Sequence, residues 1–218
     1  MSIYTVDKRY NTEVERSKRV LEIAEAFGLG LDDKEFVVFD DLDIEIREGD
    51  VVYITGQSGS GKSTVLRELS SLMTAEGKTV ADIDKVELLD APLIDQIGTS
   101  TKEALTLLSV AGLNDAYLFI RKPSELSDGQ RYRFRLAKLI ESGAQVWIAD
   151  EFLAVLDRTT AKVIAFNLQK VARSVGATVL VATTHSDMVK DLAPTVTIDK
   201  RFREKIDIKA PEGYKNAE

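Results

Sequence analysis

The spacing of apolar residues predicts an amphipathic helix near the start of the chain. Residues 11–27 carry apolar side chains three and four positions apart. These side chains share one helical face and are Val20, Ile23, Ala24 and Phe27. Asn11 or Thr12 can cap the start of this helix, and Gly28 can end it.

A strand-like pattern follows this helix. Within residues 35–46, Leu42, Ile44 and Ile46 alternate with polar residues, and a turn is expected at residues 48–50. The acidic residues of the same stretch are expected to form a solvated turn, and they are Asp40, Asp41 and Asp43.

Three short apolar runs, at residues 51–55, 146–149 and 178–183, have the length of buried strands. The first precedes a glycine loop and a helix expected from about Ser63, and each of the others follows a helical stretch. Apolar strands alternating with helices indicate an α/β protein whose parallel sheet is covered on both faces. Residues 101–113 also have a helical pattern, Trp147 is expected in the core, and residues 210–218 are expected to fray.

The stretch ELSDGQRYRFRLAKLI, residues 125–140, fits two periods. As a strand it would have a basic face of arginines suited to nucleic acid, and as a helix it would place Tyr132 and Leu136 on one side. Residues 126–139 contain no β-branched side chain, which favours the helix. Ser127 and Gln130 fit a capping box, so the helix is expected to begin near Asp128.

Bulk composition excludes several functions. The 218 residues carry a net charge of −7, which argues against coating DNA through bulk attraction. The chain has no cysteine, so a disulfide, a thiolate zinc site and a catalytic thiol are all excluded. The apolar runs are far shorter than the roughly 20 residues of a membrane helix. We therefore expect a cytoplasmic protein, with any membrane association made through a partner.

The glycine loop GQSGSGKS, residues 56–63, lies between an expected strand and an expected helix. Glycines allow backbone amides to close around phosphate oxygens, and the following helix adds its positive N-terminal dipole. In this pattern Lys62 can reach the β- and γ-phosphates, and the Ser63 hydroxyl can bind Mg²⁺. The loop therefore predicts a nucleotide site.

Acidic residues follow the second apolar run. Ligands of an open parallel sheet bind beyond the carboxyl ends of its strands. Asp150 is therefore expected beside Mg²⁺, and Glu151 is expected to polarise a water molecule for attack on the γ-phosphate. An acidic pair alone more often marks the start of a helix, but the glycine loop favours the site. His185, the only histidine, ends the third run and is expected to contact the γ-phosphate.

In this order, the motifs resemble those of the ATP-binding-cassette (ABC) ATPases over roughly residues 36–198. GQSGSGKST is similar to the Walker A loop, LSDGQ to the signature LSGGQ, and VWIADE to Walker B with its catalytic glutamate. Gln96 in LIDQIG is similar to the Q-loop glutamine, Asp157 in AVLD to the D-loop aspartate, and His185 to the switch histidine. EAFGLG, VVYITG and DEF…LDRTTAKV are most similar to a soluble, largely archaeal group within this family.

The resemblance implies a P-loop NTPase fold, with a mostly parallel sheet flanked by helices, an antiparallel β part and a reduced helical subdomain. It divides the chain into an N-terminal strand and helix extension at residues 1–35 and an ATPase domain at residues 36–210. The reduced subdomain covers about residues 97–140, and residues 211–218 form a tail.

The resemblance also implies the cofactors ATP and Mg²⁺ and a head-to-tail dimer with composite sites, either a homodimer or a heterodimer with a similar chain. It implies catalytic roles for Glu151, His185 and Gln96, and metal binding by Ser63, Gln96 and Asp150. The residues implied in nucleotide binding are Gly56, Gln57, Ser58, Gly59, Ser60, Gly61, Lys62, Ser63, Thr64, Ser127, Gly129, Gln130 and Asp157.

Some positions depart from the family pattern. Phe152 and Leu153 stand in place of Pro-Thr in the family's DEPTSALD, and Asp128 replaces the central glycine of the signature. Arg135 occupies a position that is usually small or apolar, and the sequence offers no account of it.

The base-binding position departs as well. Asp33 falls where the family has an adenine-stacking aromatic residue, which leaves Phe36 or Phe39 as the candidate. The resemblance therefore implies no strict preference for ATP over GTP.

Gln96 and Leu126 are only 30 positions apart, an interval shorter than in typical transporter subunits. This interval favours a soluble ATP-driven switch that acts on a protein or nucleic-acid partner. The alternative is the ATP-binding subunit of a membrane transporter with a permease partner. A second alternative, a non-hydrolysing regulatory module, is disfavoured because Glu151 and His185 are both present.

Overall fold

The computed structural model describes residues 2–32, 34–200 and 206–214, and the side chains of residues 12 and 34–37 lie outside this description. The described chain contains a six-stranded sheet with the strand order β4-β5-β6-β3-β7-β8. Its strands are β3 (Val51–Gly56), β4 (Val80–Asp82), β5 (Val146–Ala149), β6 (Thr178–Thr183), β7 (Val196–Lys200) and β8 (Ile206–Lys209).

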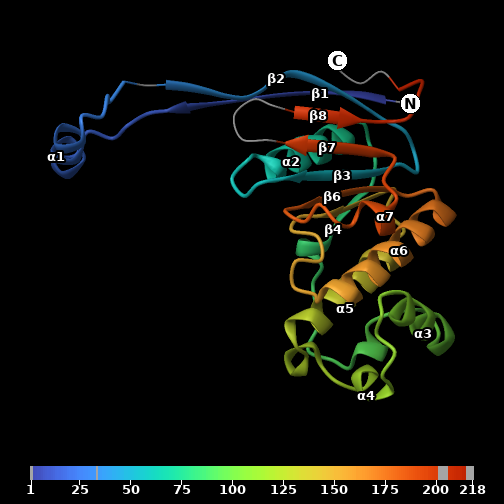
Figure 1. Ribbon diagram of the computed structural model, residues 1–218. Helices are drawn as coiled ribbons and strands as arrows, with labels where there is room; N and C mark the ends of the chain where they lie inside the picture. The colour runs from blue at the N-terminus through green and yellow to red at the C-terminus, as the bar shows by residue number, and fades with distance from the viewer. Residues whose placement is uncertain (1, 33, 201–205, 215–218) are drawn as a thin grey trace.

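Helices connect these strands. The α-helices of this part are α2 (Lys62–Ala75), α3 (Thr101–Val110), α4 (Ala116–Phe119), α5 (Asp128–Glu141), α6 (Arg158–Val175) and α7 (Val189–Leu192). Short 3-10 helices are η1 (Ile83–Lys85), η2 (Leu93–Asp95) and η3 (Pro123–Glu125). Figure 1 shows α3 and α4 together at one end of the molecule, beyond α5 and α6.

The sheet is parallel from β4 to β7, and only β8 runs antiparallel to its neighbour. Alternate side chains of β3 enter two different cores, which is expected when helices cover both faces. Val51 and Tyr53 pack with side chains of α3, α5 and α6. Val52 and Ile54 pack with side chains of α2 and of a second, smaller sheet. The predicted fold class, a mostly parallel sheet flanked by helices with an antiparallel part, is confirmed.

The second sheet is an antiparallel ribbon of β1 (Ser2–Thr12) and β2 (Lys34–Ile46). The helix α1 (Lys18–Phe27) lies between these strands along the chain. The outer part of the ribbon, residues 9–32 and 34–37, stretches away from the rest of the molecule with α1 at the far end (Figure 1). We call these residues the arm and the remaining described residues the body.

The predicted start of the first helix was wrong. Asn11 belongs to β1 and pairs with Glu35, so the helix begins only at Lys18, where the Ser17 hydroxyl accepts the Val20 amide. Its predicted end is confirmed, because Gly28 adopts a left-handed φ of 62° and its amide closes the last turn.

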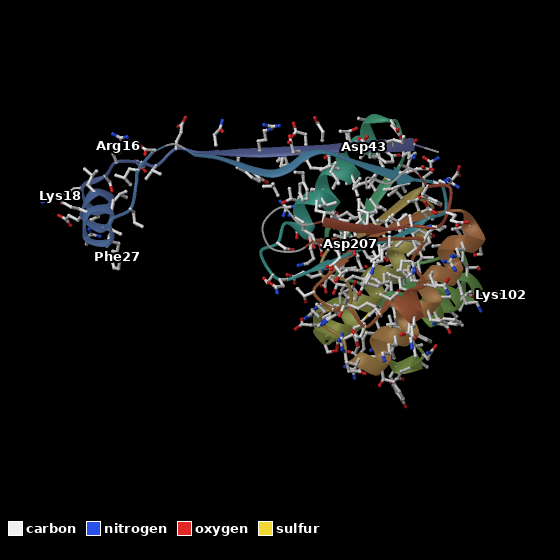
Figure 2. All side chains as sticks on the ribbon, turned by 45° about the horizontal axis from the view of Figure 1, so that its top comes forward. Arg16, Lys18, Phe27, Asp43, Lys102 and Asp207 are labelled. Carbon is white, nitrogen blue, oxygen red and sulfur yellow. The ribbon has the colours of Figure 1, made fainter. Side chains whose placement is uncertain are left out.

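The apolar face of α1 is largely uncovered. Phe27 is 72% exposed and Ile23 is also exposed, whereas Ala24 is buried. In Figure 2 the labelled Phe27 lies at the far end of the arm, together with Arg16 and Lys18. The predicted face therefore exists, but no core of the body covers it.

The acidic run lies within β2, so the expected turn was wrong, whereas the expected exposure of its residues is confirmed. The Arg9 guanidinium donates to the carboxylate of Asp40, and the Thr5 hydroxyl donates to Asp43 at 2.6 Å. Both carboxylates are thus on the solvent side of the ribbon, paired with side chains of β1.

The described end of the chain is held against the body, contrary to the expected fraying. The Tyr214 hydroxyl donates to Asp50 at 3.0 Å, and the Arg47 guanidinium lies 3.8 Å from the centre of the Tyr214 ring. Residues 215–218 lie outside the described part of the chain.

The helices α3 and α5 match their predictions more closely. α3 starts at Thr101 as expected and ends at Val110, three residues before the expected end. α5 begins at Asp128 as predicted, and Ser127 and Gln130 form the reciprocal hydrogen bonds of a capping box. The helical period therefore applies to the stretch that fitted two patterns.

Candidate functional site

The glycine loop joins β3 to α2 at the carboxyl edge of the central strands. Gly56, Gly59 and Gly61 have positive φ angles of 145°, 75° and 101°, which glycine adopts without steric cost. At Gly56 a Cβ atom would lie 2.0 Å from the carbonyl oxygen of Lys200 in β7. This position therefore requires glycine for packing as well as for conformation.

Lys62 is the first residue of α2 and is only 9% exposed. Its Nζ donates to the carbonyl of Gln57 at 2.8 Å, so the ammonium group bridges the loop. Burial lowers the pKa of Lys62, while the charges of Asp150 and Glu151 act in the opposite direction. The structure therefore places Lys62 within electrostatic reach of both predicted carboxylates.

The other predicted loop residues differ in exposure. Gln57, Ser58 and Gly59 are exposed, and Ser63 and Thr64 are half-buried in the first turn of α2. The hydroxyl of Ser60 is buried and has no hydrogen-bond partner within the described part of the chain.

Asp150 and Glu151 follow β5 on a tight turn, and not at the start of a helix. The Glu151 amide donates to Oδ1 of Asp150 at 3.0 Å. Glu151 and Leu153 both adopt left-handed φ angles, 45° and 59°. The Phe152 amide between them donates to the carbonyl of Ala182 in β6 at 2.8 Å. The exposed Glu151 side chain is thus carried by a backbone that is tied to the sheet.

A third carboxylate, Asp84, lies near this edge and was missed by the sequence reasoning. β4 pairs in parallel with β5 with Asp82 opposite Ile148, so Asp84 follows β4 at the level where Asp150 follows β5. Burial and then the charges of Asp82 and Asp150 raise the pKa of Asp84. β4 has three residues, too few for its apolar pattern to reveal a strand end.

The charge of Arg135 acts on Asp84 in the same region. Arg135 lies on α5, and its charge opposes the rise in the pKa of Asp84. Its Nε is buried without a hydrogen-bond partner among the described residues. The position that departs from the family pattern therefore supplies a positive charge beside the additional carboxylate.

The other arginines of α5 tie this helix to earlier segments of the chain. Arg131 donates to the carbonyl of Pro123 at 3.2 Å, and Arg133 donates to the carbonyl of Gly112 at 2.8 Å. Neither guanidinium belongs to a basic strand face, which was the pattern that would have suited nucleic acid.

Gln96 occupies a different setting from the one its predicted metal role needs. Its side-chain oxygen accepts the Leu89 amide at 2.8 Å, and its side-chain nitrogen donates to the carbonyls of Leu89 and Ala91. Its own carbonyl accepts from Lys138, one turn beyond Arg135 along α5. The amide therefore organises the loop before η2, and no described contact connects it to Lys62 or Asp150.

His185 follows β6 and is half-buried. Its amide donates to the Thr183 hydroxyl at 3.2 Å, and its carbonyl accepts the hydroxyl of Tyr53. A cavity of about 400 Å³ lies between this segment and the glycine loop, and its lining residues are Thr55, Gly56, Gln57, Thr184, Ser186, Asp199 and Lys200. The predicted switch residue therefore belongs to a segment that borders the loop.

The signature forms a separate group. Gly129 faces the segment before Asp157, because a Cβ there would lie 3.1 Å from Leu156. Asp157 caps α6 by accepting the Thr160 amide, and hydrogen bonds from the side chain and then from the amide of Thr160 lower the pKa of Asp157. Among the described residues, no hydrogen bond or ion pair joins residues 127–130 to the glycine loop. One chain thus presents the signature and the loop as two separate surfaces.

The guess that Phe39 stacks on a base was wrong. Phe39 is buried, its ring packs against Gly61, and Nζ of Lys200 lies 5.2 Å from the centre of that ring. The side chain of Phe36 and all of Asp33 lie outside the described residues.

Comparison with known proteins decides the family. The family model described as "ABC transporter" matches residues 39–103. The aliphatic sulfonates import ATP-binding protein SsuB 2 of Rhodococcus jostii (strain RHA1) is 34% identical over 205 residues, which span 84% of this chain and 81% of that protein. The chain belongs to the ABC ATP-binding protein family.

Other ABC relatives are longer. The methionine import ATP-binding protein MetN of Streptomyces coelicolor is 30% identical over 215 residues, which span 78% of this chain and 60% of MetN. The chain therefore spans about 60% of the length of these methionine import relatives.

Solved structures support the ABC fold. The dimeric, post-hydrolysis form of the ATP-binding cassette MJ0796 bound to ADP and Pi has a TM-score of 0.64 at 20% sequence identity, with 94% of this chain and 97% of that chain covered. None of the described helices of the present ABC domain is long and apolar enough to cross a membrane.

Proposed function

We propose that this ABC ATP-binding domain hydrolyses MgATP. The observation that carries the proposal is that the glycine loop after β3 and the pair Asp150 and Glu151 after β5 lie at the same edge of the sheet, where the charges of both carboxylates act on Lys62. In the proposed reaction the loop and Lys62 bind the β- and γ-phosphates. Glu151 orients and deprotonates the attacking water, and His185 contacts the γ-phosphate.

The donor atoms of the site suit Mg²⁺, the metal ion that the family implies. Ser63 offers a hydroxyl oxygen and Asp150 a carboxylate oxygen, and hard oxygen donors are what Mg²⁺ prefers. Among the described residues, no group of three histidine or carboxylate side chains could hold a metal ion alone. This fits an ion that is bound by one or two protein ligands and by the nucleotide's phosphates. The bound ion would neutralise charge that develops on those phosphates. Gln96 has no part in this proposal, because its amide serves the backbone of residues 89–91.

We place the reaction at the interface of a head-to-tail homodimer. Ser127 and Asp128 are exposed at the start of α5, where backbone amides and the helix dipole favour an anion. Ser127, Gly129 and Gln130 of one protomer would therefore contact the nucleotide on the loop of the other, with Asp157 beside them. The separation of the two surfaces within one chain supports this arrangement.

For the biological role, we propose the ATP-binding subunit of a membrane transporter. The support is the likeness to SsuB 2 and MetN, whose names describe import ATP-binding proteins. This proposal reverses the preference for a soluble switch that the short interval between Gln96 and Leu126 indicated. A soluble ATP-driven switch remains the second candidate, because the interval between Gln96 and Leu126 is short and its described α-helices, α3 and α4, have 10 and 4 residues.

The test of hydrolysis is Glu151→Gln, measured as phosphate release under saturating MgATP. Removing a positioned general base is expected to lower turnover by about 100-fold or more, with nucleotide binding retained and a stable ATP-bound dimer in light scattering. Glu22→Gln on the exposed part of α1 is the matched control and should leave turnover unchanged. Unchanged turnover in Glu151→Gln would reject the mechanism.

The same variant tests the role. A tagged Glu151→Gln protein is incubated with ATP and either detergent-solubilised membranes or the soluble fraction of the source cells. Transporter function predicts retention of a protein with several membrane-spanning segments from the membranes. Retention of only soluble proteins or nucleic acid would select the switch instead.

A further inference from the structure

Two tyrosine hydroxyls are hydrogen-bonded to the backbone beside Glu151 and His185, the side chains assigned to the attacking water and to the γ-phosphate. Tyr132 of α5 accepts the amide of Leu153, two residues after Glu151, with 3.2 Å between the oxygen and the nitrogen. Tyr53 of β3 donates its hydroxyl to the carbonyl of His185. The two tyrosines come from different elements and reach the two loops independently.

The loop of Glu151 needs such support because its conformation is costly. Left-handed φ angles at Glu151 and Leu153 are unfavourable for residues with a Cβ atom. The Phe152 amide is bound to β6, and the Leu153 amide is bound only through Tyr132 in the described structure. Two successive amides of the turn are thus hydrogen-bonded, one to the sheet and one to the helix that begins at the signature.

The two tyrosines are shielded from solvent to different degrees, since Tyr53 is fully buried and Tyr132 is half-buried. Desolvation raises the pKa of Tyr132, and it raises the pKa of Tyr53, which is 0% exposed, to about 12. Both phenols therefore stay protonated and neutral at physiological pH. A hydrogen bond in a partly buried setting is stronger than one in water.

We propose that Tyr132 and Tyr53 are positioning residues for ATP hydrolysis. Tyr132 holds the backbone that aims Glu151 at the attacking water, and Tyr53 holds the backbone that aims His185 at the γ-phosphate. Neither tyrosine touches the nucleotide in this scheme. The inference rests on the proposed function and adds to it a mechanical link between α5, which begins at the signature, and the catalytic turn of the same chain.

Replacing each tyrosine by phenylalanine removes only the hydroxyl. Tyr132→Phe and Tyr53→Phe are each expected to lower kcat by about 10-fold, the effect of one lost hydrogen bond, with KM for ATP changed less than about twofold. Tyr117→Phe is the matched control, because Tyr117 is 75% exposed on α4, and its kinetics should equal those of the unaltered protein.

A second background separates positioning from general damage. When Glu151→Gln is already present, Tyr132→Phe should lower the residual turnover no further, because the group that it positions is gone. A further 10-fold loss in that background would overturn the role of Tyr132. Equal losses in kcat and in ATP affinity, together with a lower melting temperature, would also overturn it in favour of simple structural support.

The test separates this inference from the proposed function. If Glu151→Gln abolishes turnover while both tyrosine variants keep full kcat, the positioning role is wrong and the hydrolysis mechanism stands. If Glu151→Gln keeps full turnover, the mechanism itself fails.

Amide exchange on the unaltered protein gives a measurement that needs no variant. The Leu153 amide should be protected as strongly as that of Phe152, and rapid exchange of Leu153 would contradict the proposed contact.

Discussion

The carboxyl edge of the six-stranded sheet and the tip of the arm both expose side chains, but their supports differ. At the sheet edge the exposed Glu151 is carried by a turn whose next residue, Phe152, is fully buried. At the tip of the arm the exposed Phe27 is carried by a helix with one buried residue, Ala24. Figure 2 shows the labelled Phe27 far from the body.

This contrast teaches that the same residue type has different energetic weight in the two regions. Side chains of the body lie in cores on both faces of a sheet, so removing one leaves a cavity. The arm is a two-stranded ribbon with a short helix, an arrangement that is marginally stable alone. Matched substitutions in the two regions measure how far this difference extends.

The largest expected difference is between two phenylalanines. Phe152→Ala should lower the free energy of unfolding by about 3–5 kcal/mol, because it empties a fully buried site. Phe27→Ala should change it by less than about 0.5 kcal/mol, because the ring is mostly in solvent. Urea unfolding followed by tryptophan fluorescence measures both, since Trp147 lies in the core of the body. Similar losses in the two variants would mean that the arm is part of the cooperative core.

A smaller difference is expected between two glycines. Gly28 and Gly176 end α1 and α6 in left-handed conformations, and a Cβ on either would meet no atom within 4 Å. Each change to alanine therefore costs about 1 kcal/mol of backbone strain alone. Gly176→Ala should lower the global free energy of unfolding by that amount. Gly28→Ala should instead accelerate amide exchange in α1 and leave global unfolding unchanged, and a matching global loss would contradict this.

The smallest effect is expected from removing most of the arm. Arg9 and Val37 are partners in the ribbon, so Asn-Gly in place of residues 10–36 can join them as a tight hairpin. The body should then unfold within about 0.5 kcal/mol of the full chain, because the deleted residues make no described contact with its cores. Phe39→Ala at the buried root is the contrasting variant and should cost about 3 kcal/mol. Aggregation or unfolding of the shortened chain would show that the arm stabilises the body.

Local signals in the sequence predicted the centre of the fold well. Runs such as VVYIT and TVLVAT are largely apolar because both sheet faces are covered. The strands β3 and β6 match these runs closely. The capping pair Ser127 and Gln130 located the start of α5, because both partners lie within one helical turn.

Non-local pairing explains the errors. Asn11 suits a helix cap, but its place in β1 is set by Glu35 across the ribbon. The acids of β2 resemble a turn only until their partners on β1 are known. Tyr132 was predicted on the apolar side of its helix, whereas its hydroxyl contact with Leu153 depends on how two distant segments pack.

The site shows the same division. The glycine loop and the pair Asp150 and Glu151 are contiguous motifs and were found from spacing. Gln96 was assigned by its order along the chain, and its hydrogen bonds to Leu89 and Ala91 could not be read from that order. Asp84 escaped notice because a three-residue strand leaves almost no periodic signal.

The order of the strands also sets when the protein can first bind a nucleotide during its synthesis. β3, which leads into the glycine loop, lies between β6 and β7, and Val52 pairs with Leu180 and with Val196. A ribosome must therefore synthesise β6 or β7 before this strand gains either neighbour. Closing such long loops is slow, so completion of the sheet is expected to be a late step in folding. Until then the apolar strand β3 is an unpaired edge, which makes the nascent chain a natural client for a chaperone.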